Sequence, residues 1–260
     1  MYSITSISEV RCPAVYVTSK IEARANDFTF QIWPGKAHRR YDEEMQASII
    51  AFDNVTDIDV FFLWDLLNRV RSPNWTVRIL GERERLISST GMEIKTHGRL
   101  REAERSEVVL FSSGPGTRQL RNDRAFLSQL ILDPARQMIG SMCSGALLLA
   151  ALGLLEGKSA TTYPTATGLL EDYGVRVVEK AFVREGNIAT AAGCLAAQYL
   201  AGWVLEEKFG AKTRDRVLRS VQPVGEGLLF SDAAYVATVY ADPAQPAEAA
   251  AAEARLQQLR

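Results

Sequence analysis

Residues 137–150 read QMIGSMCSGALLLA, and this stretch decides the fold. A short apolar run leads into a turn of small residues around Cys143, and an Ala- and Leu-rich run follows. This order predicts a buried strand, a tight turn and a helix, with Cys143 at the turn. The N–H groups and dipole of a helix start favour the thiolate, the nucleophilic form of cysteine. Free cysteines are also often buried, so these residues alone leave both a nucleophile and a structural thiol open.

Strand and helix patterns alternate on both sides of this turn. The segments that have the composition or periodicity of strands are 47–52, 75–81, 108–111, 159–162, 176–178 and a hairpin over 182–190. Helical patterns cover 59–70, 123–132 and 196–209, the last ending at Gly210. The alternation predicts an α/β fold with a parallel sheet covered by helices on both faces. Ligands bind such folds at the carboxyl ends of the strands, where Cys143 is expected.

The chain divides into three parts by composition. Residues 1–46 are an N-terminal extension of uncertain structure, with strand-like runs at 15–18 and 28–32. Residues 47–240 form the predicted α/β domain. Residues 241–260 are a tail rich in Pro, Ala and Glu, which is typical of a disordered end.

Composition excludes several classes of protein. The 260 residues carry a net charge of −1, which gives no electrostatic basis for binding nucleic acid or an anionic membrane. No apolar run approaches the roughly 18 residues of a membrane span. The N-terminus has no basic segment followed by an apolar one, so we expect no secretory signal and a cytoplasmic protein.

The metal-ligand and thiol inventory is small. The three cysteines, Cys12, Cys143 and Cys194, are widely separated and odd in number, which argues against a disulfide framework. The only histidines are His38 and His97, and no Cys/His cluster has metal-ligand spacing. We therefore expect no metal and no cofactor.

Four motifs occur in order along the domain: FDNVTDID at 52–59, VLFSSGPGT at 109–117, MCSGA at 142–146 and GLLEGKSATTYP at 153–164. Together they resemble the ThiJ/PfpI superfamily, which has the class I glutamine amidotransferase-like fold. The chain looks most similar to the isonitrile hydratase subgroup, and the resemblance covers residues 47–225.

The resemblance implies a flavodoxin-like fold, usually a homodimer, with Cys143 on a nucleophile elbow. Asp59 falls on the position of the family's acidic partner, and Asp65 keeps the spacing of a second helix carboxylate. Asp65 is more typical of a solvated helix residue than of a catalytic one. Ser144 falls where the hydratases have a hydroxyl-bearing Thr. From the residues alone, Asp59 could instead belong to the helix cap, together with Asp57.

The chemistry that the resemblance implies needs one soft nucleophile and one carboxyl group. The Cys143 thiolate would attack the terminal carbon of an isonitrile, and Asp59 would deliver a proton and then help activate water. Backbone N–H groups near Gly114 and Ser144 would stabilise developing negative charge. A buried carboxyl beside a thiolate should have a raised pKa.

The substrate pocket for such a small molecule would be lined by Ser113, Gly114, Ser144, Tyr163 and Cys194. The family usually has Pro-Gly-Gly where this chain has Ser112-Ser113-Gly114, so two of those three positions depart from the pattern. A third departure is Tyr163, which stands where many members have histidine. Without that histidine, amide hydrolysis and His-dependent glyoxalase chemistry lose their base, whereas a Cys/Asp mechanism loses less. A redox pair of Cys194 with Cys143 has no CxxC motif to support it.

Two alternatives remain open. One is another cysteine-dependent reaction on a small electrophile, of the amidase or glyoxalase kind. The other is a non-catalytic redox sensor or interaction protein, since an oxidisable thiol can signal stress.

Overall fold

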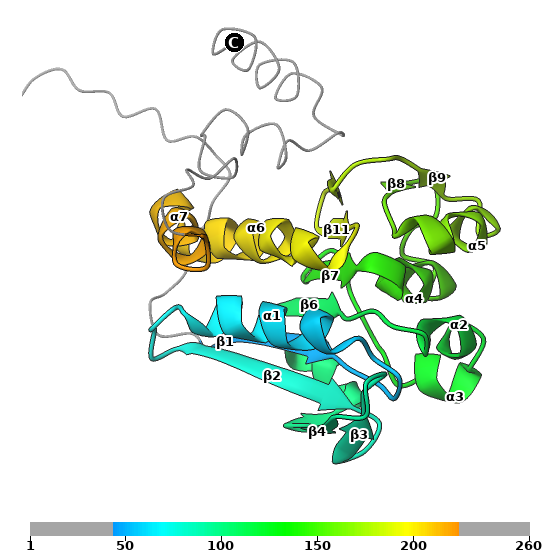
Figure 1. Cartoon of the computed structure of the whole chain (residues 1–260), viewed down its shortest axis with the longest axis horizontal. Helices are drawn as coiled ribbons and strands as arrows, with labels where there is room; N and C mark the ends of the chain where they lie inside the picture. The colour runs from blue at the N-terminus through cyan, green and yellow to red at the C-terminus, as the bar shows by residue number, and fades with distance from the viewer. Residues whose placement is uncertain (1–43, 224–260) are drawn as a thin grey trace, which may run out of the picture. The chain divides into compact units, whose positions relative to one another are not determined.

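The computed structural model describes residues 44–223, which form the domain shown in Figure 1. The strand-like runs at 15–18 and 28–32, Cys12, His38 and the tail at 241–260 lie outside the described residues. Among residues 44–223 there is no helix whose length and apolar character would let it cross a membrane.

The core of the domain is a seven-stranded sheet in the order β10-β11-β7-β6-β1-β2-β5. Its strands are β1 (Met45–Ile50), β2 (Trp75–Gly81), β5 (Gly98–Arg99), β6 (Val108–Phe111), β7 (Met138–Met142), β10 (Phe182–Glu185) and β11 (Ile188–Ala191). Every neighbouring pair is parallel except β10 and β11, which form an antiparallel hairpin. The predicted α/β fold with a mainly parallel sheet is confirmed.

Two small sheets lie outside the main one. β3 (Arg85–Ile87) and β4 (Glu93–Lys95) form an antiparallel pair that the sequence analysis missed. β8 (Ser159–Ala160) and β9 (Arg176–Val177) correspond to the strands predicted at 159–162 and 176–178. They pair only with each other and do not extend the main sheet.

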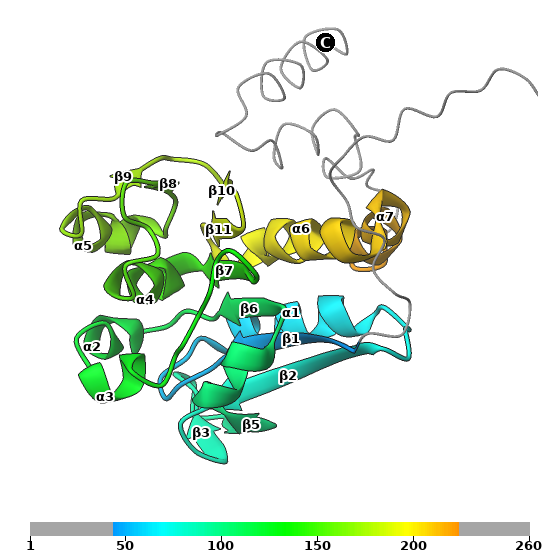
Figure 2. The same cartoon turned by 180° about the vertical axis from the view of Figure 1, so that it is seen from behind.

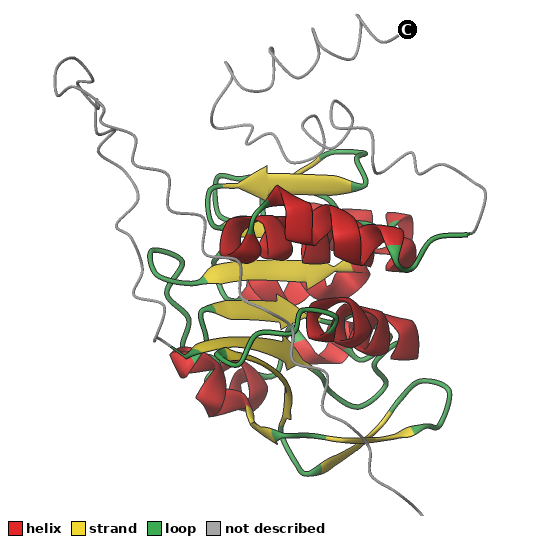
Figure 3. Ribbon diagram, turned by 90° about the vertical axis from the view of Figure 1, so that its left-hand side faces the viewer, coloured by secondary structure: helices red, strands yellow, loops and turns green. Residues whose placement is uncertain are grey.

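Helices lie on both sides of the sheet (Figure 3). α1 (Asp57–Asn68) and α6 (Ala197–Phe209) pack side by side on one face, and η1 (Leu100–Arg105) lies on the other (Figures 1 and 2). The remaining helices are α2 (Thr117–Leu120), α3 (Arg124–Leu127), α4 (Ala146–Ala151), α5 (Thr167–Glu171) and α7 (Ala211–Arg219). Single 3₁₀ turns are η2 (Cys143–Gly145), η3 (Pro164–Ala166) and η4 (Cys194–Ala196).

Burial explains why the central strands form. All residues of β6 and β7 are buried, as are the last four of β1. Continuous burial is expected for parallel strands that are covered on both faces. Gly186 has φ of 63° at the predicted hairpin turn, and Gly210 has φ of 81° where α6 ends. The helix predicted over 123–132 is shorter, because the segment capped by Asp123 ends at Leu127.

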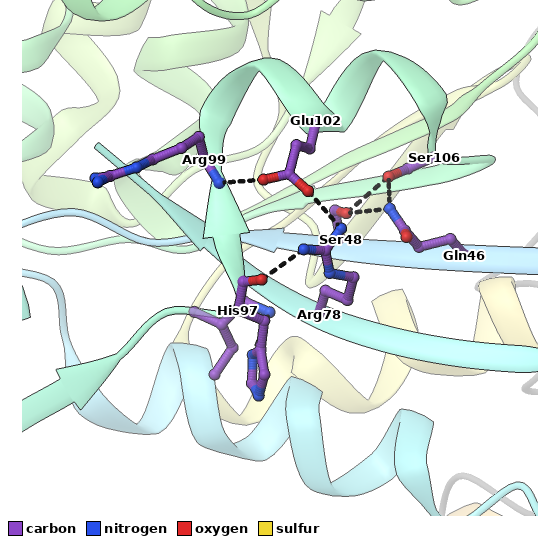
Figure 4. Close-up of polar contacts among 8 residues, drawn as sticks. Gln46, Ser48, Arg78, His97, Arg99, Glu102 and Ser106 are labelled. Atoms are coloured by element: carbon purple, nitrogen blue, oxygen red, sulfur yellow. Dashed lines mark hydrogen bonds and ion pairs between the residues drawn. The ribbon is translucent and has the colours of Figure 1, made fainter. Parts of the chain in front are cut away.

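Hydrogen bonds of Arg78 and Glu102 hold the edge strand β5 in place (Figure 4). The Arg78 guanidinium donates to the carbonyl oxygen of His97 at 2.5 Å and to the Glu102 carboxylate at 2.7 Å. Glu102 also accepts from the backbone N–H of Arg99 at 2.6 Å. The His97 ring stacks on Trp64 of α1, with centroids 4.9 Å apart. This network ties β5 and η1 to β2 and α1.

A second group of hydrogen bonds in Figure 4 joins β1 to the residue that follows η1. Ser106 Oγ lies 2.7 Å from Ser48 Oγ, and the Gln46 side-chain amide donates to Ser106 Oγ at 2.7 Å. Ser48 and Ser106 are fully buried. Their hydrogen bonds to each other offset the cost of burying two hydroxyl groups.

Candidate active site

Four neighbouring parallel strands, β11, β7, β6 and β1, end at one edge of the sheet, and the segment after each contributes to one site. Cys143 directly follows β7, Ser113 follows β6, and Cys194 follows β11. Asp59 lies in the first turn of α1, after β1. The sheet thus brings together four positions that are far apart in the sequence, at the edge where parallel sheets bind ligands.

Cys143 lies on a strained turn between β7 and η2. Its φ is 43°, in the left-handed region that residues other than glycine rarely adopt. The carbonyl oxygen of Cys143 accepts a hydrogen bond from Thr162 Oγ1 at 2.8 Å. A Cβ at Gly145 would lie 2.6 Å from the carbonyl oxygen of Ser112, so only glycine allows this approach of the turn to the β6 loop. These features are those of a nucleophile elbow.

Asp59 is fully buried. Its Oδ2 accepts a short hydrogen bond from Ser113 Oγ, while its Oδ1 has no hydrogen-bond partner among residues 44–223. Burial raises the pKa of Asp59, and the Ser113 hydroxyl and the Cys194 thiol lower it in part. The raised pKa agrees with the expectation for a buried carboxyl group beside a thiol.

The helix-cap interpretation of Asp59 is wrong. α1 begins at Asp57 after Thr56, and no side chain caps it. Asp57 instead accepts a hydrogen bond from Thr90 Oγ1 at 3.0 Å. The side chain of Asp65 is 48% exposed and pairs with Arg69 at 2.7 Å, as a solvated or structural helix carboxylate would.

Three acidic groups meet at the site. A carboxylate oxygen of Asp59 and the sulfur atoms of Cys143 and Cys194 all lie within 4.8 Å of one another. Cys143 is 5% exposed, and Cys194 is half-buried. Cys194, which the sequence analysis placed in a loop near the pocket, is therefore in direct reach of both predicted catalytic groups.

The environment opposes ionisation of both thiols. Burial raises the pKa of Cys143, and the negative charge of Asp59 raises it further; the Gly193 backbone and the Ser113 and Cys194 side chains lower it in part. Burial and the charge of Asp59 also raise the pKa of Cys194. The thiolate expected from a helix start is thus not favoured in the unliganded site. The physical reason is that α4, which follows the turn, has only six residues, and its dipole acts against desolvation and a neighbouring carboxylate.

A pocket of about 250 Å³ opens in front of Cys143. The five residues predicted to line it do so: Ser113, Gly114, Ser144, Tyr163 and Cys194. Tyr163 is 49% exposed and lies at the solvent side.

The sequence analysis missed four further lining residues: Thr56, Pro115, Arg118 and Thr165. Arg118 is the cation among them, and its guanidinium donates to Thr165 Oγ1 at 3.1 Å. Arg118 directly follows the Gly-rich loop 112–117. A basic residue next to that loop was the sequence feature that could have predicted it as a lining residue.

The predicted oxyanion donors have a specific arrangement. The backbone N–H of Gly114 points to Ser144 Oγ at 3.4 Å, and Thr117 Oγ1 donates to the same oxygen at 3.0 Å. Ser144 is thereby held against the β6 loop. A bound anionic intermediate would have to compete with this hydroxyl for the Gly114 N–H.

Comparisons with known proteins show the family of the chain. A family model described as the DJ-1/PfpI family matches residues 45–207. The isonitrile hydratase of Pseudomonas putida is 29% identical over 175 residues, which cover 66% of this chain and 76% of that protein. The glutathione-independent glyoxalase DJ-1 of Schizosaccharomyces pombe is 22% identical over 160 residues, covering 57% of this chain and 83% of that protein.

Solved structures support the fold alone. A ThiJ/PfpI family protein from Pseudomonas syringae superposes with a TM-score of 0.65 at 20% identity, covering 84% of this chain and 88% of that protein.

Proposed function

The chain belongs to the DJ-1/PfpI family, and we propose that it is a cysteine-dependent hydratase that adds water to an isonitrile to give an N-substituted formamide. One observation carries the proposal: a buried Asp59 carboxyl with a raised pKa lies within 4.8 Å of the Cys143 sulfur, next to a small pocket. The similarity to an isonitrile hydratase at 29% identity supports the choice of substrate class.

The reaction begins with one proton on Asp59 and a thiolate at Cys143. The sulfur bonds to the terminal carbon of the isonitrile, and Asp59 donates its proton to the same carbon, which gives a thioimidate. The raised pKa of Asp59 suits this step, because burial shifts the carboxyl group toward the protonated form that can donate. Since the pKa of Cys143 is also raised, its proton must pass to solvent as substrate binds, while Asp59 holds the proton that it donates to the carbon.

Hydrolysis of the thioimidate then restores both groups. The Asp59 carboxylate accepts a proton from water as the water oxygen bonds to the carbon. The remaining hydroxyl proton passes to the nitrogen, the carbon–sulfur bond breaks, and the formamide leaves with Cys143 as thiolate. The sum is one isonitrile plus one water, and no oxidant or cofactor is consumed.

Ser113 acts as a positioning residue in this scheme. Its hydroxyl donates to Asp59 Oδ2 and leaves Oδ1 without a partner among the described residues. The free oxygen is then available to the substrate carbon or to water. Tyr163 and Arg118, at the pocket wall, contact the organic group of the isonitrile.

Formamide production from a series of alkyl isonitriles tests the proposal. We expect turnover by the unmodified chain, none by Cys143→Ala, and normal turnover by Asp65→Asn, a matched control on the exposed face of the same helix. Absence of turnover with every isonitrile would remove the substrate assignment. Full activity of Cys143→Ala would remove the mechanism.

A second candidate is a reaction of the same thiol with a 2-oxoaldehyde. The similarity to a glutathione-independent glyoxalase favours it, whereas Tyr163 in place of the family histidine weighs against it. Consumption of methylglyoxal, measured with the same three proteins, separates the two reactions.

A further inference from the structure

Cys194 is the group at this site that the proposed reaction does not use. It begins η4 after Gly193, whose φ is 88°. Its sulfur lies within 4.8 Å of both the Cys143 sulfur and an Asp59 carboxylate oxygen. A hydratase mechanism needs one thiol and one carboxyl, so the second thiol at this distance calls for another explanation.

We propose that Asp59, Cys143 and Cys194 bind one thiophilic divalent cation, with Zn²⁺ as the reference ion. Two thiolates and a carboxylate are ligands that zinc takes in proteins. The cation displaces the two thiol protons to solvent. Binding is a property of the unliganded site and does not depend on which substrate the protein turns over.

The distances fit a tetrahedral site with a small adjustment. With Zn–S bonds of about 2.3 Å, two sulfur ligands lie about 3.8 Å apart. The ligand atoms of the site are at most 4.8 Å apart. Cys194 begins the short turn η4 at the surface, since it is half-buried and its neighbour Leu195 is 66% exposed. With a Zn–O bond of about 2.1 Å, a sulfur and an oxygen ligand lie about 3.6 Å apart, so the largest remaining distance is about 1.2 Å. Movement of the surface segment at Cys194 can close the distances to its sulfur, and the Asp59 and Cys143 side chains must close the distance between them.

Asp59 supplies an independent observation. It is fully buried, and within the described part of the chain it forms no ion pair and its Oδ1 accepts no hydrogen bond. An unsatisfied buried carboxylate oxygen is costly, and a cation bonded to it would remove that cost. The Ser113 hydroxyl on Oδ2 would orient the ligand in the way that outer hydrogen bonds orient metal-binding carboxylates.

The pocket in front of the three groups provides the fourth ligand position. It is about 250 Å³ in volume and is lined by Cys143, Cys194 and Ser113, so a water molecule can complete the coordination. A cation held here occupies the sulfur of Cys143. Metal binding and covalent chemistry at Cys143 are therefore mutually exclusive.

Titration of the reduced, full-length protein with Co²⁺ in a metal-free, thiol-free reductant tests the site. We expect one Co²⁺ per chain, a sulfur-to-cobalt charge-transfer band with the intensity of two thiolates, visible bands of a tetrahedral ion, and displacement by Zn²⁺. Bound Zn²⁺ should also protect Cys143 from alkylation. These readouts need no substrate, so they stand or fall separately from formamide production.

Variants assign the ligands. Cys194→Ser should halve the charge-transfer intensity and weaken binding by more than the roughly 10–100-fold that loss of an outer hydrogen bond costs. Asp59→Asn should weaken binding but keep the intensity of two thiolates. Ser113→Ala should fall within the roughly 10–100-fold range itself. Cys12→Ser and Asp65→Asn are the controls and should bind as the unmodified chain does.

Three results would overturn the proposal: no stoichiometric Co²⁺ binding by the reduced protein, a charge-transfer band that survives Cys194→Ser at full intensity, or loss of the band in Cys12→Ser. Far-ultraviolet circular dichroism of each variant shows whether it is folded. Cys194→Ala serves as a second substitution at the same position, because a serine hydroxyl could act as a weak ligand.

Discussion

Glu102 and Asp59 are two carboxyl groups of one domain with opposite surroundings. Glu102 accepts from the Arg99 backbone and from Arg78, and these hydrogen bonds hold its pKa below its usual value. Asp59 is buried with a serine hydroxyl on one oxygen and no partner on the other among residues 44–223, and its pKa is raised. In the β5 network the carboxylate has hydrogen-bond and ion-pair partners. At the ends of β1, β6, β7 and β11, one oxygen of the Asp59 carboxyl group has no partner among the described residues.

The difference shows that this domain keeps strained and unpartnered groups at the strand ends, although they lower its free energy of unfolding. The elbow at Cys143 has a left-handed backbone, which costs of order 1–3 kcal/mol for a residue other than glycine. Unsatisfied and strained groups persist where reactivity or binding needs them. We therefore expect substitutions in the β5 network to change stability, substitutions of the reactive side chains at the site to change chemistry, and substitutions in the elbow backbone to change stability as well.

Asp59→Asn should give the largest effect. Removing the acid/base group should lower formamide production by about 10²–10⁴-fold. It should also speed alkylation of Cys143 near neutral pH, because the charge of Asp59 raises the pKa of that thiol. Steady-state rates and iodoacetamide labelling measure the two changes. Slower labelling would contradict the assigned interaction.

Gly145→Ala should disturb the elbow next in order. The new Cβ would lie 2.6 Å from the Ser112 carbonyl oxygen, so either the turn or the β6 loop must shift. Overpacking of this kind typically costs about 1–3 kcal/mol of unfolding free energy. Gly168→Ala in α5 is the matched control, since its Cβ would meet nothing within 4 Å. This substitution should raise the free energy of unfolding by roughly 0.5–1 kcal/mol, because alanine is more favourable than glycine in a helix. Urea denaturation measures both free energies of unfolding. If Gly145→Ala were as stable as Gly168→Ala, the close approach of the two backbones at Gly145 would be unimportant.

Glu102→Ala should lower the free energy of unfolding by about 1 kcal/mol, because the ion pair with Arg78 is partly solvated and the hydrogen bond from Arg99 is lost. Turnover should be unchanged. Glu93→Ala, which removes an exposed partner of Arg85, is the control and should change stability by less than about 0.5 kcal/mol. A loss of turnover in Glu102→Ala would mean that the two regions are coupled.

The smallest effect should be a pH dependence from His97. Desolvation lowers its pKa, and the charges of Arg78 and Lys95 lower it further. The unfolded chain then binds the proton more readily, so stability is complete above pH about 6.5 and falls as the pH drops from there to the folded pKa. Protonation also removes the acceptor that Nδ1 offers to the Ile79 N–H at 3.0 Å. His97→Gln should flatten the stability profile in this range; an unchanged profile would assign it to other groups.

The buried strands were predictable because their apolar runs are continuous. β2 and β6 have the predicted limits, and the β10–β11 hairpin forms around Gly186 as expected. β3, β4 and β5 were missed because they have two or three residues each and a largely exposed, polar composition. Such short pairs depend on tertiary contacts more than on local pattern.

At the site, the sequence identified the residues but not their state. Cys143 and the five predicted lining residues do meet in one pocket, and buried Asp59 lies within 4.8 Å of the Cys143 sulfur, whereas their roles stay predictions. Arg118 was missed because it lies in α2, just beyond the β6 loop, and its side chain meets the pocket only through the tertiary fold. The raised pKa of Cys143 and the unpartnered oxygen of Asp59 depend on burial, for which the local sequence gives no signal.

Assembly of the site from four strand ends also has a consequence for folding. Asp59, Ser113, Cys143 and Cys194 are separated by long stretches of chain and meet only when β1, β6, β7 and β11 are paired in register. Closing such loops delays these contacts to a late stage of folding. The nascent or partly unfolded chain therefore carries these groups apart, and the clustered thiols and carboxyl exist only in the completed sheet. Any activity or ion binding that needs all of them is accordingly a direct measure of how much of the chain is fully folded.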